Sequence, residues 1–79
     1  MPASVSEVRE VILSGFPGAN VGGVKEENHR IIGVIQWEGF KNVGIDERNR
    51  WVTERVRNKL GLKGLNVGIL YPLAPGEHL

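Results

Sequence analysis

The sequence predicts an α+β fold of two layers, a three-stranded mixed sheet with helices packed on one of its faces. Apolar residues recur at helical spacing near the N-terminus and again in the middle of the chain, and runs with strand character follow each of these stretches. A chain of 79 residues builds only one modest core. Three strands cannot hide both faces with so little chain, so one face stays wetter. The predicted order is α-β-β-(α)-α-β, in a single domain over residues 1–79.

The first helix is predicted over Ser4–Ser14. Ser4 and Glu7 have the spacing of a capping box, and apolar residues then recur at helical intervals. Gly15 and Pro17 stand where the helix should end, because glycine tolerates a left-handed cap and the proline ring forbids continuation.

A hairpin of two strands is predicted next. Residues 19–25 form a twisted or bulged strand around Gly22 and Gly23, and residues 26–28 form a polar turn. The second strand covers residues 30–37 and is rich in β-branched residues. Its alternation brings Ile31, Ile35 and Trp37 to one face and Ile32 and Val34 to the other.

The main helix is predicted to start at Gly44 or Asp46 and to end at Gly61, a natural cap. Before it, Phe40 docks on the core and residues 41–44 form a turn or one short helical turn. Asp46 and Arg50 have the favourable i,i+4 spacing of an ion pair. On a helical wheel, Ile45, Val52, Val56 and Leu60 form the apolar stripe, and Glu47, Arg50, Glu54 and Arg57 lie opposite.

The third strand is predicted over residues 65–71, where Leu65, Val67, Ile69 and Tyr71 alternate with the residues between them. Pro72 and Pro75 are expected to close it off. This strand must pair with one of the first two.

Composition excludes several classes of function. The absence of cysteine rules out disulfides, thiolate metal sites and a thiol nucleophile. No catalytic triad spacing, phosphate-cradling loop or metal-ligand cluster is recognisable, so we expect no enzymatic activity. No apolar run is long enough for a membrane span and the N-terminus has no signal-peptide pattern, which predicts a cytoplasmic location.

The segment from Phe40 to Val52 resembles the Phe-Gly…Arg-His-Arg segment of the BolA-like family, whose fold is also KH-like. Arg48-Asn49-Arg50 stands in place of Arg-His-Arg, and the terminal Pro75-Gly76-Glu77 is similar to the family's Pro-Glu-Glu. The resemblance implies an adaptor or regulator with a partner such as a monothiol glutaredoxin, in iron handling or stress response. It covers roughly residues 8–77.

The chain departs from the family where an iron–sulfur cluster would be shared with glutaredoxin. Asn66 replaces the histidine ligand, and an amide oxygen is a poor ligand for such iron. The loop between the first two strands, which carries the second ligand in the family, holds neither histidine nor cysteine here. We therefore expect no cofactor, although His29 is a weak candidate ligand that is more simply read as an exposed turn residue.

The expected partner-binding residues are Arg48, Arg50, Trp51, Arg55, Asn66 and Val67. The helix residues among them have two interpretations: a solvated face with i,i+4 ion pairs, or a basic face around a tryptophan that suits a partner. Trp51 could equally lie at the edge of the core.

An alternative is a KH-like nucleic-acid-binding module or a DNA-binding transcriptional regulator. Its phosphate contacts would be Arg48, Arg50, Arg55, Arg57, Lys59 and Lys63, with a steep salt dependence of binding. Gly61-Leu62-Lys63-Gly64 has the Gly-x-x-Gly form of KH loops, although it is also a plain cap and turn. A third possibility is weak homodimerisation through an exposed sheet face with Trp37 or an unpaired edge strand.

Overall fold

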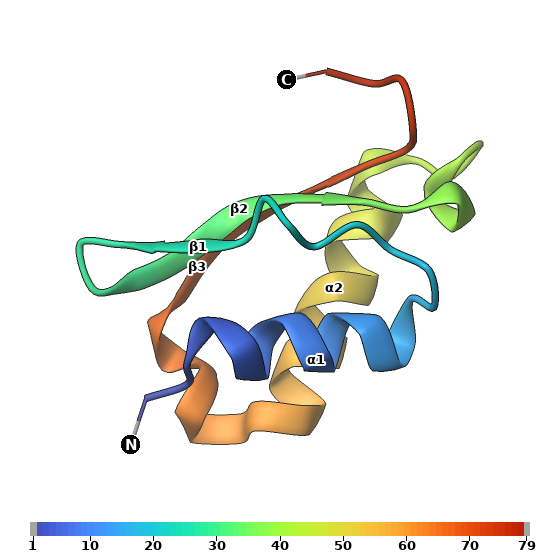
Figure 1. The fold of residues 1–79 in the computed structure, drawn as a ribbon. Coiled ribbons are helices and arrows are strands. Elements are labelled where there is room, and N and C mark those ends of the chain that lie inside the picture. The colour runs from blue at the N-terminus through green and yellow to red at the C-terminus, as the bar shows by residue number, and fades with distance from the viewer. Residues whose placement is uncertain (1, 79) are drawn as a thin grey trace.

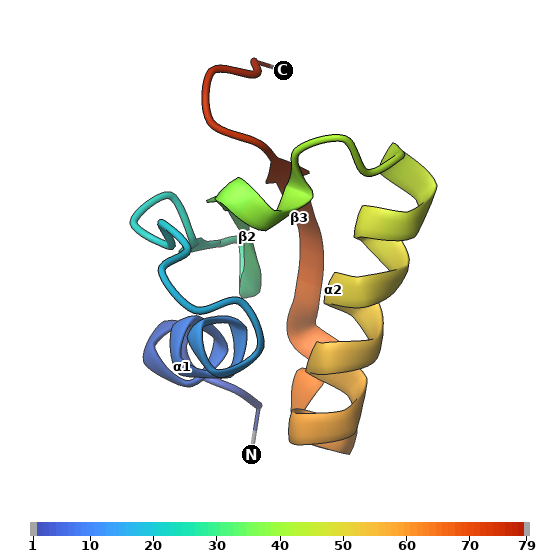
Figure 2. The same ribbon diagram turned by 90° about the vertical axis from the view of Figure 1, so that its right-hand side faces the viewer.

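The computed structural model, which describes residues 2–78, has the predicted two layers. Figure 1 shows helix α1 (Val5–Gly15) and most of helix α2 (Ile45–Leu60) on the same side of the sheet, and Figure 2 shows α2 running beside strand β3. The element order is α1, β1 (Lys25–Glu27), β2 (Arg30–Gln36), a short 3-10 helix η1 (Glu38–Phe40), α2, a second 3-10 helix η2 (Gly61–Asn66) and β3 (Val67–Leu73).

Helix α1 begins as the sequence predicts. The Ser4 hydroxyl accepts the Glu7 N–H at 3.1 Å, while the Glu7 carboxylate accepts the Ser4 N–H at 3.0 Å. These reciprocal bonds satisfy two of the donors that a helix start leaves without partners. Val8 and Ile12 are completely buried and fasten the helix to the sheet.

The first strand differs from its prediction. Asn20 makes an isolated bridge to Gln36, with main-chain bonds of 2.7 and 3.1 Å, and the chain then leaves the sheet at Gly22. Strand β1 starts only at Lys25 and includes Glu26 and Glu27, which were predicted as a turn. The prediction failed because polar edge residues need not be buried, so hydrophobic pattern does not report such a strand.

The hairpin turn consists of two residues, Asn28 and His29, with φ of 52° and 65°. A two-residue hairpin turn of this kind needs both residues in the left-handed region, which asparagine tolerates better than most residues. Strands β1 and β2 pair antiparallel, whereas β2 and β3 pair parallel, in the spatial order β1-β2-β3.

Strand β3 also differs from its prediction, because it begins at Val67 and continues through Pro72. Pro72 pairs with Ile35 in the register of the sheet. Its carbonyl points away from β2, toward α2, and its nitrogen faces the same way. A proline is tolerated there because no ladder donor is lost. Leu70 and Pro72 are the buried residues of this strand, while Ile69 is 62% and Tyr71 42% exposed.

The core lies between the sheet and the helices and includes Phe40, which is fully buried. Phe40 stacks near Phe16, Trp37 and Trp51, with ring centroids 5.4, 5.2 and 6.4 Å away. Trp37 is therefore part of the core edge, and its indole N–H donates to the Pro17 carbonyl at 2.8 Å. The sheet face left open carries other residues: Ile32, Val34, Ile69 and Tyr71.

Candidate functional site

Arg48 is the predicted site residue whose position differs most from expectation. The wheel placed Ile45 in the apolar stripe, but Ile45 is 54% exposed and Arg48 is buried at 7% exposed. The stripe therefore runs through Arg48, Val52 and Val56. A guanidinium on this stripe faces the molecule, so Arg48 offers no donors on the exposed basic face to which it was assigned.

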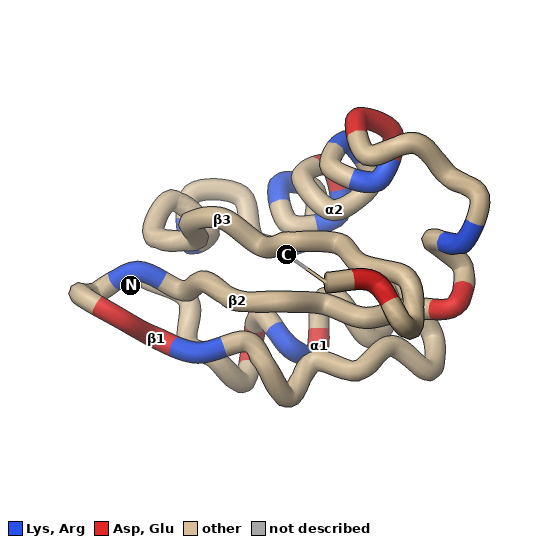
Figure 3. The backbone as a smooth tube through the Cα atoms, turned by 90° about the horizontal axis from the view of Figure 1, so that it is seen from above, with Lys and Arg blue, Asp and Glu red and all other residues tan. Residues whose placement is uncertain are grey.

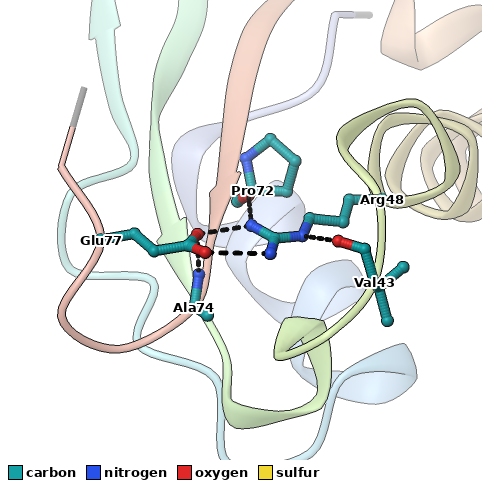
Figure 4. Close-up of polar contacts among 5 residues, drawn as sticks. All are labelled: Val43, Arg48, Pro72, Ala74 and Glu77. Carbon is teal, nitrogen blue, oxygen red and sulfur yellow. Dashed lines mark hydrogen bonds and ion pairs between the residues drawn. The ribbon is translucent and has the colours of Figure 1, made fainter.

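All three nitrogens of the Arg48 guanidinium donate hydrogen bonds inside the fold, as Figure 4 shows. Its Nη1 and Nη2 donate to the two carboxylate oxygens of Glu77 at 2.5 and 3.0 Å, a bidentate pair. Its Nε donates to the Val43 carbonyl at 2.8 Å, and Nη1 also donates to the Pro72 carbonyl at 3.1 Å. The charge is buried at low cost because it is both paired and hydrogen-bonded.

This ion pair shifts the titration of both partners. The hydrogen bonds from Arg48, together with the Ala74 N–H at 2.8 Å, lower the pKa of Glu77 to about 2. The hydrogen bonds to Glu77 raise the pKa of Arg48. Both groups are thus held in their charged forms, which is the behaviour of a structural clamp.

Trp51 and Arg50 share the carboxylate of Glu47. The Trp51 indole N–H donates to Glu47 Oε1 at 3.1 Å, and Arg50 forms an ion pair with the same oxygen. The i,i+4 spacing predicts an ion pair between Arg50 and Asp46. Arg50 instead pairs with Glu47, three residues earlier in the helix. Trp51 is half-buried and packs on the core.

Arg55 docks on the other helix. Its Nη2 donates to the Ser14 hydroxyl at 3.0 Å, and its side chain lies against Gly15, where a β-carbon would clash with the guanidinium. A cation at the C-terminal end of α1 also suits the helix dipole. Arg55 and Trp51 line a shallow hollow between the helices, away from the sheet.

Asn66 and Lys63 hold the N-terminal segment. The Asn66 amide bonds both main-chain groups of Ala3: Nδ2 donates to the carbonyl at 3.0 Å, and Oδ1 accepts the N–H at 3.3 Å. Lys63 forms an ion pair with Glu7, which lowers the pKa of Glu7. The two interactions join η2 to the start of α1.

The residues at the positions where the BolA-like resemblance implies cluster ligands make other contacts or stand exposed. Both atoms of the Asn66 amide already bond Ala3. Glu26 and Glu27 lie in strand β1, and His29 stands exposed at the turn. Within residues 2–78, no three histidine, cysteine or carboxylate side chains gather in a way that could hold a metal ion.

A hollow lies between α2 and β3, and we name it the α2–β3 groove. It has a volume of about 570 Å³ and is closed at one end by η2. Of the described residues that line it, Arg57 alone is charged and Thr53 alone has a polar uncharged side chain. Leu62 and Leu65 stand on its rim, 84% and 80% exposed. Its apolar lining consists of Val52, Val56, Leu62, Leu65, Val67 and Leu70.

The structure therefore divides the predicted site. Val67 lies in the groove, Trp51 and Arg55 lie on another side of α2, and Asn66 faces Ala3. Sequence reasoning missed the groove because it assigned Leu65 to the third strand and interpreted Leu62 only as part of a cap and turn or of a KH-like loop. Leu62 and Leu65, each directly after a glycine, were the available signal.

The comparisons with known proteins leave the family open. No protein-family model matches the chain, and no curated protein matches it. No helix within residues 2–78 has both the length and the apolar character needed to cross a lipid bilayer.

Proposed function

We propose that this protein is a non-enzymatic adaptor that binds another protein through the α2–β3 groove. The observation that carries the proposal is the pair of exposed leucines, Leu62 and Leu65, on the rim of an open apolar groove. Single exposed apolar side chains are common on protein surfaces, but a hollow lined by them marks an interaction site. Covering this surface would gain roughly 25 cal/mol for each Å² of apolar area removed from water.

A monothiol glutaredoxin is the first partner to test, on the strength of the BolA-like resemblance around Phe40 and Arg48 to Val52. The proposal includes a cytoplasmic role in iron handling or stress response that does not depend on a shared cluster. The engagement of the Asn66 amide by Ala3 supports this independence from the cluster.

An amide-resolved NMR titration with a monothiol glutaredoxin tests the proposal, first with the apo partner and then with the partner carrying its cluster. We expect shifts at Arg57, Leu65 and Val67 with either form. The variant Leu65→Lys should lose at least tenfold in affinity, whereas Leu13→Lys, at an exposed position of α1 outside the groove, should bind as the wild type does. No shifts at stoichiometric excess would rule out this partner, and shifts confined to residues outside the groove would overturn the site.

Nucleic-acid binding is the second candidate, favoured by Arg57 and Lys59, which form no ion pair within residues 2–78. The other predicted phosphate contacts are already engaged: Arg48 by Glu77, Arg50 by Glu47, Arg55 by Ser14 and Lys63 by Glu7. Figure 3 shows basic and acidic positions intermixed along α2. Fluorescence anisotropy with oligothymidylate would favour this candidate only if affinity fell steeply with added salt.

A further inference from the structure

The two edges of the sheet differ in how they are protected. Strand β1 forms one edge with only three residues, Lys25-Glu26-Glu27, all exposed and all charged. Short, charged edges discourage the addition of another strand. Strand β3 forms the other edge with seven residues and no charged side chain. Pro72 and helix α2 protect the C-terminal part of this second edge, whereas the α2–β3 groove opens beside residues 68–70.

The outer edge of β3 faces the α2–β3 groove. The carbonyl of Pro72 points to α2, so Leu70, two residues earlier in the strand, also turns its main-chain groups outward. Within residues 2–78, the main chain of Gly68, Ile69 and Leu70 makes no hydrogen bond beyond those of the sheet ladder. Both Gly68 and Leu70 line the groove.

The free edge has a defined end. Pro72 has no N–H to offer, and its carbonyl already accepts from Arg48. The Val67 N–H, at the other end, donates to the Gly64 carbonyl. An added strand can therefore pair with residues 68–70 but not beyond them. At the other end, η2 brings Leu62 and Leu65 against the same stretch.

The groove beneath this edge suits side chains that alternate. A strand paired to β3 lies about 4.8 Å from it, and every second side chain of that strand points to the helix-covered side of the sheet. On that side lie Val52 and Val56 of α2. Gly64 keeps the space open, because a β-carbon there would come within 3.3 Å of both Val56 and Leu60.

The charge of the groove indicates the chemistry of its occupant. Arg57 is the one charged residue among the described residues that line it, and no carboxylate faces it. Arg57 also has no ion-pair partner in the described part of the chain. A carboxylate on the ligand would satisfy this guanidinium in a partly desolvated setting.

We propose that the groove binds an extended peptide segment of the partner as a fourth strand on β3, with apolar side chains at alternate positions and a carboxylate that meets Arg57. This inference rests on the proposed adaptor function and specifies how the partner is recognised. Main-chain hydrogen bonds to residues 68–70 supply part of the affinity, and the groove supplies the specificity.

Selection from a displayed library of random peptides against the full chain tests the inference. Enriched peptides should alternate apolar residues with others and carry aspartate or glutamate at one position. Repeating the selection on Arg57→Glu should replace that acidic residue by lysine or arginine. Synthetic copies of an enriched peptide should lose at least tenfold in affinity for Leu65→Lys and none for the control Leu13→Lys, at an exposed position of α1 outside the groove. Both variants are first shown to be folded by their amide spectra.

N-methylation of the peptide separates strand addition from other modes of binding. Methyl groups on every second amide in one register should abolish binding, while the other register should leave it unchanged, because only alternate N–H groups face β3. The inference would be overturned if both methylation registers had equal effects or if the enriched residues had helical spacing. It would also be overturned if the wild type enriched no peptides beyond those that Leu65→Lys enriches. If a glutaredoxin still shifted the amide signals of the groove residues in the NMR titration, the adaptor function would remain supported although strand addition was disproved.

Discussion

The side-chain amide of Asn66 both donates to and accepts from the main chain of Ala3, which requires a side chain with both a donor and an acceptor. Its two polar atoms match the N–H and the carbonyl of Ala3, and Ala3 is itself buried at 5% exposed. The Ala3 N–H also donates to the Lys63 carbonyl at 2.8 Å. The side chain thus works as a structural link between η2 and the N-terminal segment.

Substituting Asn66→Ala should lower the free energy of unfolding by about 1–2 kcal/mol, because it removes two partly buried hydrogen bonds. Urea unfolding followed by tryptophan fluorescence measures the change. The control Asn58→Ala, at an exposed position of α2, should stay within ~0.5 kcal/mol of the wild type. Equal stabilities of the two variants would show that the link to Ala3 contributes nothing.

Strand β2 depends on one glycine. Gly33 has φ of 145° and lies against the main chain of Gly23, so close that an added β-carbon would overlap its carbonyl. The same position interrupts the register between β2 and β3. The loop before β1 can cross the strand only because neither residue carries a side chain at this point.

Substituting Gly33→Ala should therefore cost about 2–5 kcal/mol, from backbone strain and from overpacking together. Circular dichroism during thermal unfolding would record a much lower Tm or no cooperative transition. The matched substitution Gly44→Ser meets no atom within 4 Å and caps α2, so it should be neutral or stabilising by a few tenths of a kcal/mol. A cooperative Gly33→Ala variant with the wild-type Tm would disprove the close approach.

Across the whole molecule, the Arg48–Glu77 pair joins α2, the end of β3 and the C-terminal segment. One guanidinium bonds groups at Val43, Pro72 and Glu77, which lie far apart in the sequence. Arg48 also lies 5.9 Å from the centre of the Phe40 ring. The clamp fixes the edge of the sheet next to the α2–β3 groove.

This clamp predicts how stability depends on pH. The Glu77 pKa of about 2 in the folded chain is below the ordinary glutamate value of about 4.3. The unfolded chain therefore binds more protons between these values, so the clamp's contribution is present above pH ~4.3 and is lost as the pH falls toward 2. Glu7, whose pKa is also lowered, acts in the same direction.

The variant Glu77→Gln should be less stable than the wild type at neutral pH, because the buried Arg48 loses its counter-charge. It should also lose less stability than the wild type between pH ~4.3 and 2. Urea midpoints measured across this range test both effects, with Glu38→Gln, which forms no ion pair within residues 2–78, as the control. Parallel pH curves for the wild type and Glu77→Gln would show that the pair does not titrate with folding.

Local sequence signals predicted much of the fold. The capping box at Ser4, the helix α2 with Gly61 at its end, and the strand character of β2 are confirmed, as is the α+β class. The bounds of an element were predicted less well where its apolar residues do not recur at a regular spacing. Examples are the polar strand β1 and the proline that continues β3 along a free edge.

The sequence by itself determined the elements and their order, because capping, periodicity and turn chemistry act over a few neighbouring residues. Only the tertiary structure decided that Arg48 is buried, that Asn66 bonds Ala3, and that η2 and β3 leave an apolar groove beside α2. These features depend on contacts between segments distant in the chain. Periodicity indicates which side of a helix is apolar, but a paired and hydrogen-bonded charge can occupy that side once its partner is brought there by the fold.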